Sequence, residues 1–129
     1  MSTRMGSQPH ESAIGHVTGT AQYVDDQPLP DNAVHIAIGV SNTAAGNFSL
    51  EQLQEQLLIA ASAPGIIDVV TAADIPGHNE IGAVFDGDPL FAENAVEYQG
   101  QPMFAIAAQT LRQALQAVAK VELAITPTE

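Results

Sequence analysis

The sequence has 129 residues, which suits one domain with a core of its own. Three cationic side chains stand against fifteen carboxylates, and the net charge of −12 excludes the basic patch that nucleic acid or an anionic membrane surface would need. There is no cysteine, so disulfides, thiolate zinc sites, cysteine-ligated iron–sulfur clusters and cysteine nucleophiles are excluded. No apolar run reaches the ~20 residues of a membrane helix, and no secretory signal is recognised, so we expect a cytoplasmic protein.

The first third of the chain is predicted to form a leader and two strands. Residues 1–9 are rich in Ser and Gly and are expected to be flexible. Residues 17–24 carry strand-forming side chains at most positions, and residues 34–40 give the clearest strand, because large aliphatic residues alternate there with small ones or histidine. The alternation places Val34, Ile36, Ile38 and Val40 on one face and His35, Ala37 and Gly39 on the other.

A helix is predicted to begin after Ser49 and to end before Pro64. Ser49 is a favourable N-cap, Gln52 completes a capping box, and Phe48 and Leu53 occupy the two positions of a hydrophobic staple. The apolar stripe of this helix consists of Leu50, Leu53, Leu57, Leu58 and Ala61.

An irregular stretch occupies the middle of the chain. Residues 66–70 form a short apolar run with β-branched side chains and predict a buried strand. Residues 72–102 are then rich in Gly and Pro turns, with short extended pieces expected only at 83–85 and 95–98. A connection of this length usually has a function or forms an interface.

The last third is predicted to form a strand, a helix and a strand. Residues 103–108 are an apolar strand, Thr110 caps the helix with Gln113 as its box partner, and residues 121–125 alternate as a final strand. The helix stripe consists of Leu111, Leu115, Val118 and Ala119, and the alternating residues of the final strand are Val121, Leu123 and Ile125.

Two strand–helix–strand units with an irregular insertion between them define the expected fold class, α/β (α+β). We expect one domain over residues 10–129, preceded by the leader at 1–9. Neither a repeat nor a low-complexity tract is visible.

Side chains that could carry chemistry are scattered. The four histidines stand in the leader, a strand or loops, with no pair at helical spacing, so surface positions are expected for His10, His16, His35 and His78. Catalytic motifs such as a nucleophile elbow, a P-loop or a His-Glu-x-x-His helix are missing.

The acidic and glycine-rich loops are weak candidates for ligand sites. Asp86 and Asp88 resemble the start of a calcium loop but lack the ligands that should follow, and the pair at 25–26 precedes a proline-rich corner, so plain turns are expected. Phosphate binding over residues 77–87 would depend on backbone amides alone. We therefore assign no catalytic, cofactor-binding or metal residue.

Four segments, in order, resemble the aldehyde oxidase/xanthine dehydrogenase family. They are residues 19–26 (GTAQYVDD), 64–79 (PGIIDVVTAADIPGHN), 88–92 (DPLFA) and 96–102 (VEYQGQP). The resemblance spans about residues 10 to 125, nearly the whole chain. The opening at 10–19 looks most like the bacterial xanthine dehydrogenase branch, where this part starts a separate subunit. Residues 44–48 depart from the family, which usually has a basic or histidine-containing segment there.

The resemblance implies the α/β hammerhead domain that opens the molybdenum-binding part of these enzymes. Such enzymes hydroxylate purines, in purine catabolism, or aldehydes at a molybdenum–molybdopterin centre, with water as the oxygen source. Electrons leave through iron–sulfur clusters and FAD on partner subunits or domains. The molybdopterin-binding segments and the glutamate base of the family lie in later domains, so no residue role is carried onto this chain, and the reading frame is expected to continue beyond residue 129.

Three functions remain open at this point. The first is a structural and subunit-contact role within such an enzyme, with residues 72–102 as the contact surface. The second is a stand-alone, non-catalytic binding or adaptor module of the same fold. The third is a small acidic metal-dependent enzyme that uses Asp86, Asp88 and a histidine.

Overall fold

The computed structural model describes residues 10–84 and 87–128, and the chain divides into two compact units, Met1–Asn32 and Ala33–Glu129. The predicted leader at 1–9 lies outside the described residues. The first unit contains helix α1 (Ala13–Thr18) and a 3-10 turn η1 (Val24–Asp26), so the prediction of a strand at 17–24 is wrong.

Local hydrogen bonds explain this difference. The Thr18 hydroxyl donates to the Ile14 carbonyl at 2.7 Å, and Gly19 ends α1 with a φ of 74°, which favours glycine. The Asp26 carboxylate accepts from the Tyr23 N–H at 3.0 Å and closes the turn η1. Strand propensity is therefore overridden by capping residues inside the same segment.

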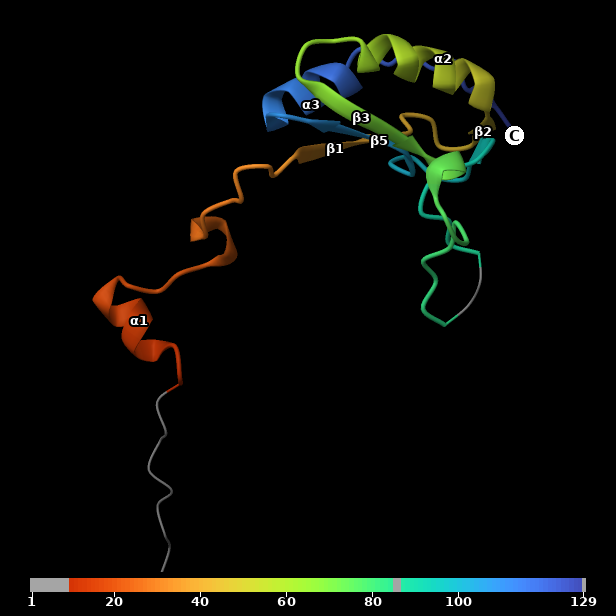
Figure 1. Cartoon of the computed structure of the whole chain (residues 1–129). Coiled ribbons are helices and arrows are strands. Elements are labelled where there is room, and N and C mark those ends of the chain that lie inside the picture. The colour runs from red at the N-terminus through yellow and green to blue at the C-terminus, as the bar shows by residue number, and fades with distance from the viewer. Residues whose placement is uncertain (1–9, 85–86, 129) are drawn as a thin grey trace, which may run out of the picture. The chain divides into compact units, whose positions relative to one another are not determined.

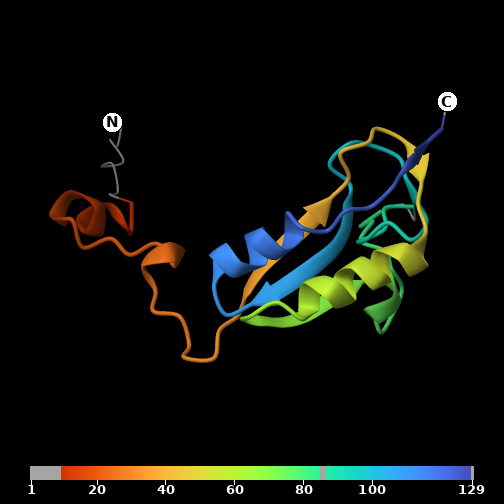
Figure 2. The ribbon, with the colours of Figure 1, turned by 90° about the horizontal axis from the view of Figure 1, so that it is seen from above.

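The second unit is built on a three-stranded antiparallel sheet in the order β1-β5-β3. β5 lies between the other two strands, so β1 and β3 run parallel without touching each other. Helices α2 and α3 lie together over one face of this sheet (Figures 1 and 2). The predicted mixed fold is confirmed, with the bounds β1 (His35–Val40), α2 (Leu50–Ala61), β3 (Ile66–Thr71), β5 (Pro102–Ala108) and α3 (Leu111–Val118).

A second small sheet has the order β4-β2-β6 and brings together three short strands from distant parts of the sequence. Its strands are β2 (Gly46–Asn47), β4 (Ala95–Val96) and β6 (Thr126–Pro127), and the turn η2 (Ala72–Asp74) follows β3. The final strand therefore pairs at 126–127, not at 121–125 as predicted. The predicted alternation is still visible, because Val121, Leu123 and Ile125 are half-buried against the core.

Helix α2 begins and packs largely as its local sequence indicates. The Ser49 hydroxyl accepts from the Gln52 N–H at 3.3 Å, and Phe48 and Leu53 are buried in one apolar cluster. The buried face runs through Leu53, Leu57 and Ala60, whereas Leu58 is 70% exposed. The predicted stripe was therefore wrong at Leu58.

Helix α3 is capped as predicted but is rotated from the predicted stripe. Thr110 accepts from the Gln113 N–H at 3.3 Å. The buried residues are Ala114 and Ala117, and Leu111 and Leu115 are exposed. The reason is the close approach of the helix to the sheet, where Ala114 clusters with Ala37 and Ala108.

Small residues of β1 face the helices. Gly39 lies under the ring of Phe104, and a Cβ at this position would overlap that ring. The large aliphatic residues of β1 therefore point to the other side of the sheet. β3 is less buried than predicted, since Ile67 and Asp68 are exposed at an irregularity in its pairing with β5.

None of the helices in the described ranges has the length and apolar character of a membrane span.

Candidate functional site

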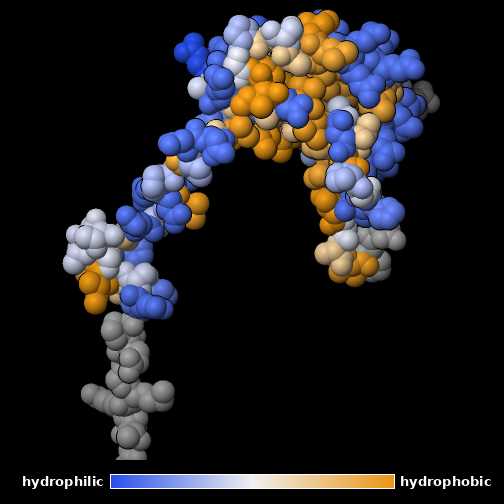
Figure 3. Space-filling model, viewed as in Figure 1, coloured by the Kyte–Doolittle hydropathy of each residue, from blue (hydrophilic) through white to orange (hydrophobic). Residues whose placement is uncertain are grey.

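Within the second unit, the face of the sheet opposite the helices is apolar and is not covered by another helix or strand of that unit. Ile36, Ile38 and Val40 are 59%, 54% and 51% exposed. Ala107 and Ala105 of β5 lie opposite Ile36 and Ile38, so all four side chains share this face. Figure 3 shows apolar side chains on the side of the sheet away from α2 and α3, and others on the outer side of the helices.

Two rows of side chains cross this face. One row joins Ile38, Ala105 and Val70, and the other joins Ile36, Ala107 and Asp68. Within these two rows Asp68 is the only charged residue. Ile36 and Ile38 are exposed, Ala107 and Val70 are half-buried, and Ala105 is buried. Exposed apolar side chains grouped on a small domain are typical of a surface that meets another polypeptide. We call these residues, together with Val40, the open face.

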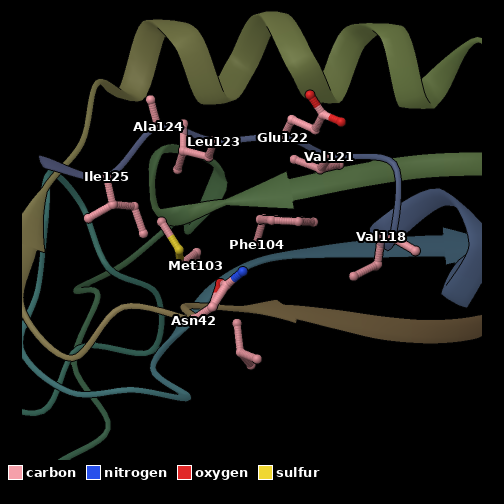
Figure 4. A pocket seen from close by; sticks show the side chains of 11 residues that line it. Asn42, Met103, Phe104, Val118, Val121, Glu122, Leu123, Ala124 and Ile125 are labelled. Carbon is pink, nitrogen blue, oxygen red and sulfur yellow. The ribbon is translucent and has the colours of Figure 1, made fainter.

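Two hollows adjoin the end of β1. One has a volume of about 410 Å³ and is lined by Ile38, Val40 and the turn at 99–100. The other, of about 680 Å³, lies between β5 and the segment 121–125, and Figure 4 shows Met103, Phe104 and Leu123 on its walls. Val40, Asn42 and Val118 line both hollows, so the margin of β1 is less tightly filled than the core.

The irregular segment 72–102 is held by polar side chains rather than by regular pairing. The Asn79 amide donates to the Phe91 carbonyl at 2.7 Å, and its oxygen accepts from the Phe91 N–H at 3.0 Å. These two hydrogen bonds resemble the pair that two residues exchange in an antiparallel sheet, although Asn79 contributes its side chain rather than its backbone. The predicted extended piece at 95–98 is matched by β4 at 95–96; no strand is present at 83–84, and residue 85 lies outside the described ranges.

Glu80 closes the same segment through backbone amides. Its carboxylate accepts from the N–H groups of Gly82 at 3.0 Å, Gly87 at 2.8 Å and Asp88 at 2.9 Å. The bonds from Gly87 and Gly82 lower the pKa of Glu80 most, partial burial acts in the opposite direction, and the bond from Asp88 lowers it further.

The segment is tied to the open face at its far end. The Gln101 side chain is buried, and its oxygen accepts from the Glu97 N–H at 2.7 Å. The Gly100 N–H donates to the Ser41 carbonyl at 2.8 Å, and the Ser41 N–H donates to the Gln101 carbonyl at 2.9 Å. Residues 97–101 therefore lie directly beside the end of β1.

The histidines considered in the sequence are not brought together. The His10 Nδ1 lies 2.8 Å from the Ser12 hydroxyl, and the His16 Nδ1 lies 3.1 Å from the Tyr23 hydroxyl. His35 is half-buried on β1, and His78 is exposed in the irregular segment. Among the described residues no three His, Cys, Asp or Glu side chains are placed to hold a metal ion.

The acidic candidates serve local structure where they are described. Asp26 caps η1, and the Asp88 amide is a donor to Glu80. Asp86 lies outside the described residues. The Gly82 and Gly87 amides, which a phosphate would need, already donate to a carboxylate.

Sequence reasoning missed the roles of Asn79, Glu80 and Gln101. Asn79 and Gln101 stand inside the segments that carry the family resemblance, but no spacing rule links a side chain to an amide across an irregular loop. The open face was visible as the alternation in β1, yet the pattern alone does not say which face the helices cover.

This geometry defines a class of protein. It is a small α+β domain with helices on one side of a sheet and an open apolar face on the other. Residues 18–128 match the sequence profile described as aldehyde oxidase and xanthine dehydrogenase, a/b hammerhead domain. This chain belongs to that family.

Relatives with established names have the same region. The chain is 33% identical over 120 residues to aldehyde oxidase 4 of Mus musculus, covering 93% of this chain and 8% of that protein. It is 35% identical over 117 residues to xanthine dehydrogenase 1 of Arabidopsis thaliana, covering 91% and 8%. Animal and plant enzymes thus match at similar identity. The predicted likeness to the bacterial xanthine dehydrogenase branch stays a prediction.

Solved structures contain the same fold. Aldehyde oxidoreductase from Desulfovibrio gigas superposes with a TM-score of 0.79 at 24% identity, over 94% of this chain and 14% of that chain. Reconstituted CO dehydrogenase from Oligotropha carboxidovorans superposes with a TM-score of 0.78 at 25% identity, over 94% and 15%. The chain therefore spans a small part of the proteins that it matches.

Proposed function

We propose that this chain acts as the hammerhead domain of a cytoplasmic molybdenum hydroxylase that hydroxylates purines or aldehydes with water as the oxygen source. Its role is to support and contact the parts of the enzyme that hold the cofactors. The observation that carries this proposal is the family match over residues 18–128, combined with the 8% share that the domain takes in its named relatives.

The described residues do not fit the molybdopterin group of such an enzyme. A pterin diphosphate or phosphate needs free backbone amides or cations, and the Gly82 and Gly87 amides are bonded to Glu80. The two described cations, Arg112 and Lys120, stand in and just after α3, away from the open face. We therefore assign the molybdenum cofactor, and the iron–sulfur and FAD groups, to other domains or subunits.

Molybdenum content tests this proposal directly. The chain is purified from its native host through an affinity tag at its N-terminus, and the metal is measured by mass spectrometry together with xanthine and aldehyde oxidation. We expect molybdenum and iron to co-purify in a species much larger than 13.4 kDa. A metal-free species of any size contradicts the proposal and favours the adaptor function.

A further inference from the structure

We propose that the open face and the described residues of the irregular segment, 72–84 and 87–102, form one docking surface, and that its occupant is another polypeptide surface of the same enzyme. That surface is apolar where it meets the sheet and basic where it meets the segment. The inference rests on the function proposed above and adds the location and chemistry of the contact.

The two parts of the docking surface are continuous. The segment leaves β3 through η2, projects from the sheet on the side away from the helices, and returns beside Ser41 at the end of β1 (Figure 1). Exposed apolar side chains continue along it at Ile81, Val84 and Tyr98. A partner that covers the sheet therefore also meets the segment.

The two sides of the unit differ in net charge. The described residues of the segment carry five carboxylates and neither lysine nor arginine, whereas the helix side carries both signs of charge, with Glu51 and Glu55 on α2. Arg112 and Lys120 both lie with α3, on the side of the sheet that the helices cover. A complementary partner carries Lys or Arg around an apolar centre, because opposite potentials favour encounter and like charges oppose it.

A second copy of this chain is not the expected occupant, because its charge has the wrong sign. Each copy carries a net charge of −12 and would bring a second acidic segment to the contact, so copies should associate only when salt screens their repulsion. A basic partner removes this repulsion.

A shallow hollow beside Ile38 and Val40 lies at the edge of the proposed contact. Its volume is about 410 Å³, and it is lined by the turn at 99–100 and, on the helix side, by Val118 of α3. A partner side chain in this hollow would contact both the open face and the turn.

Thiol labelling tests which face is covered, because the chain has no cysteine of its own. Ile38→Cys places a thiol on the open face, and Gln54→Cys places one on the exposed side of α2 as a matched control. Both variants are labelled with N-ethylmaleimide in the isolated chain and in the enzyme purified from the native host, and the labelled peptides are quantified by mass spectrometry.

We expect both thiols to react at similar rates in the isolated chain. In the assembled enzyme the Ile38→Cys thiol should react at least about tenfold more slowly, since a covered thiol reacts only after local opening. The Gln54→Cys thiol should keep its rate.

Equal rates for the Ile38→Cys thiol in the two states overturn the docking inference, even when molybdenum is present. A purified homodimer that protects this thiol also overturns it, because the occupant is then a second copy. Protection by a larger assembly without molybdenum leaves the docking surface standing and contradicts only the proposed function. Recovery of the tagged chain alone contradicts both.

Discussion

Asn79 and Glu80 organise the irregular segment by bonding backbone groups that lie further along the chain. Asn79 bonds both polar groups of Phe91, and Glu80 collects three amides. Neighbouring side chains thus replace the regular pairing that the segment lacks. The rigidity of this part of the docking surface depends on Asn79 and Glu80, because a backbone amide that loses its protein partner must hydrogen-bond to water instead.

Acid should loosen the segment through Glu80. The folded chain lowers the pKa of this carboxyl, so its stabilisation is complete above the ordinary glutamate pKa of about 4.3 and is lost as the pH falls through the lower folded value. We expect the protection of the Gly82, Gly87 and Asp88 amides, measured as the exchange rate relative to that of an unstructured peptide at the same pH, to fall at acidic pH.

Nuclear magnetic resonance of backbone amides measures this effect. In Glu80→Gln the three amides should already exchange faster at neutral pH, and their acid response should vanish, since the neutral side chain is a weaker acceptor. Glu55→Gln on the exposed side of α2 serves as the control. An unchanged acid response in Glu80→Gln would show that another group titrates.

A methyl group at Gly39 should destabilise the domain. The added Cβ would overlap the Phe104 ring, which is buried between β1 and the helices. We expect Gly39→Ala to lower the free energy of unfolding by about 1–3 kcal/mol, as overpacking of a core does. Urea unfolding measures it, with Gly77→Ala as the control because nothing lies within 4 Å of a Cβ there. Equal midpoints for the two variants would mean that the ring moves aside freely.

At the level of elements, the two helices show which information is local. Ser49 and Thr110 cap α2 and α3 as predicted, because a cap depends on residues three positions apart. The buried face of α3 was not predictable, because alanines rather than leucines allow its close approach to β1. The same holds for β1, where Gly39 rather than the large residues meets the core.

The candidate site was foreseen in part for the same reason. The length and turn content of residues 72–102 indicated an interface, and the alternation in β1 isolated its aliphatic face. Their union in one docking surface depends on the return of the chain beside Ser41, a long-range contact that periodicity does not encode.

Two leucines of α2 separate core from surface. Leu53 is fully buried, whereas Leu58, five positions later, is 70% exposed. We expect Leu53→Ala to lower the free energy of unfolding by about 2–5 kcal/mol and Leu58→Ala by less than about 0.5 kcal/mol. Urea denaturation of the isolated chain measures both. A comparable loss in Leu58→Ala would mean that the outer side of α2 is also packed.

On the scale of the whole molecule, charge and apolar area work against each other. The acidic side chains keep copies apart, whereas the open face favours contact. The balance between them should respond to ionic strength, because the distance over which charges repel each other falls to about 3 Å in 1 M salt.

The isolated chain should therefore self-associate more at high salt. Sedimentation velocity in rising sodium chloride measures the change, and Ile38→Glu should suppress it by placing charge on the open face. Gln54→Glu adds the same charge on the exposed side of α2 and should leave the association nearly unchanged. A monomer at all salt concentrations would contradict the assignment of the open face as adhesive.

Charge reversal within the segment should weaken assembly of the enzyme. Glu97 is exposed next to the tie at Gln101, and Glu97→Lys places a cation where a basic partner is expected. We expect less assembled enzyme by analytical ultracentrifugation, with the difference shrinking in salt. Glu55→Lys is the control on α2. Unchanged complex formation by Glu97→Lys would remove residues 72–102 from the contact.

The position of β1 at the edge of its sheet sets a demand on biosynthesis. An uncharged aliphatic edge strand can pair with any other strand, and such edges are starting points for aggregation. Between folding and docking, the mutual repulsion of the carboxylates slows the aggregation of this chain. Substitutions that exchange surface carboxylates for lysine could thus leave the fold intact and still reduce the yield of finished enzyme, because the loss occurs in the interval before the partner arrives.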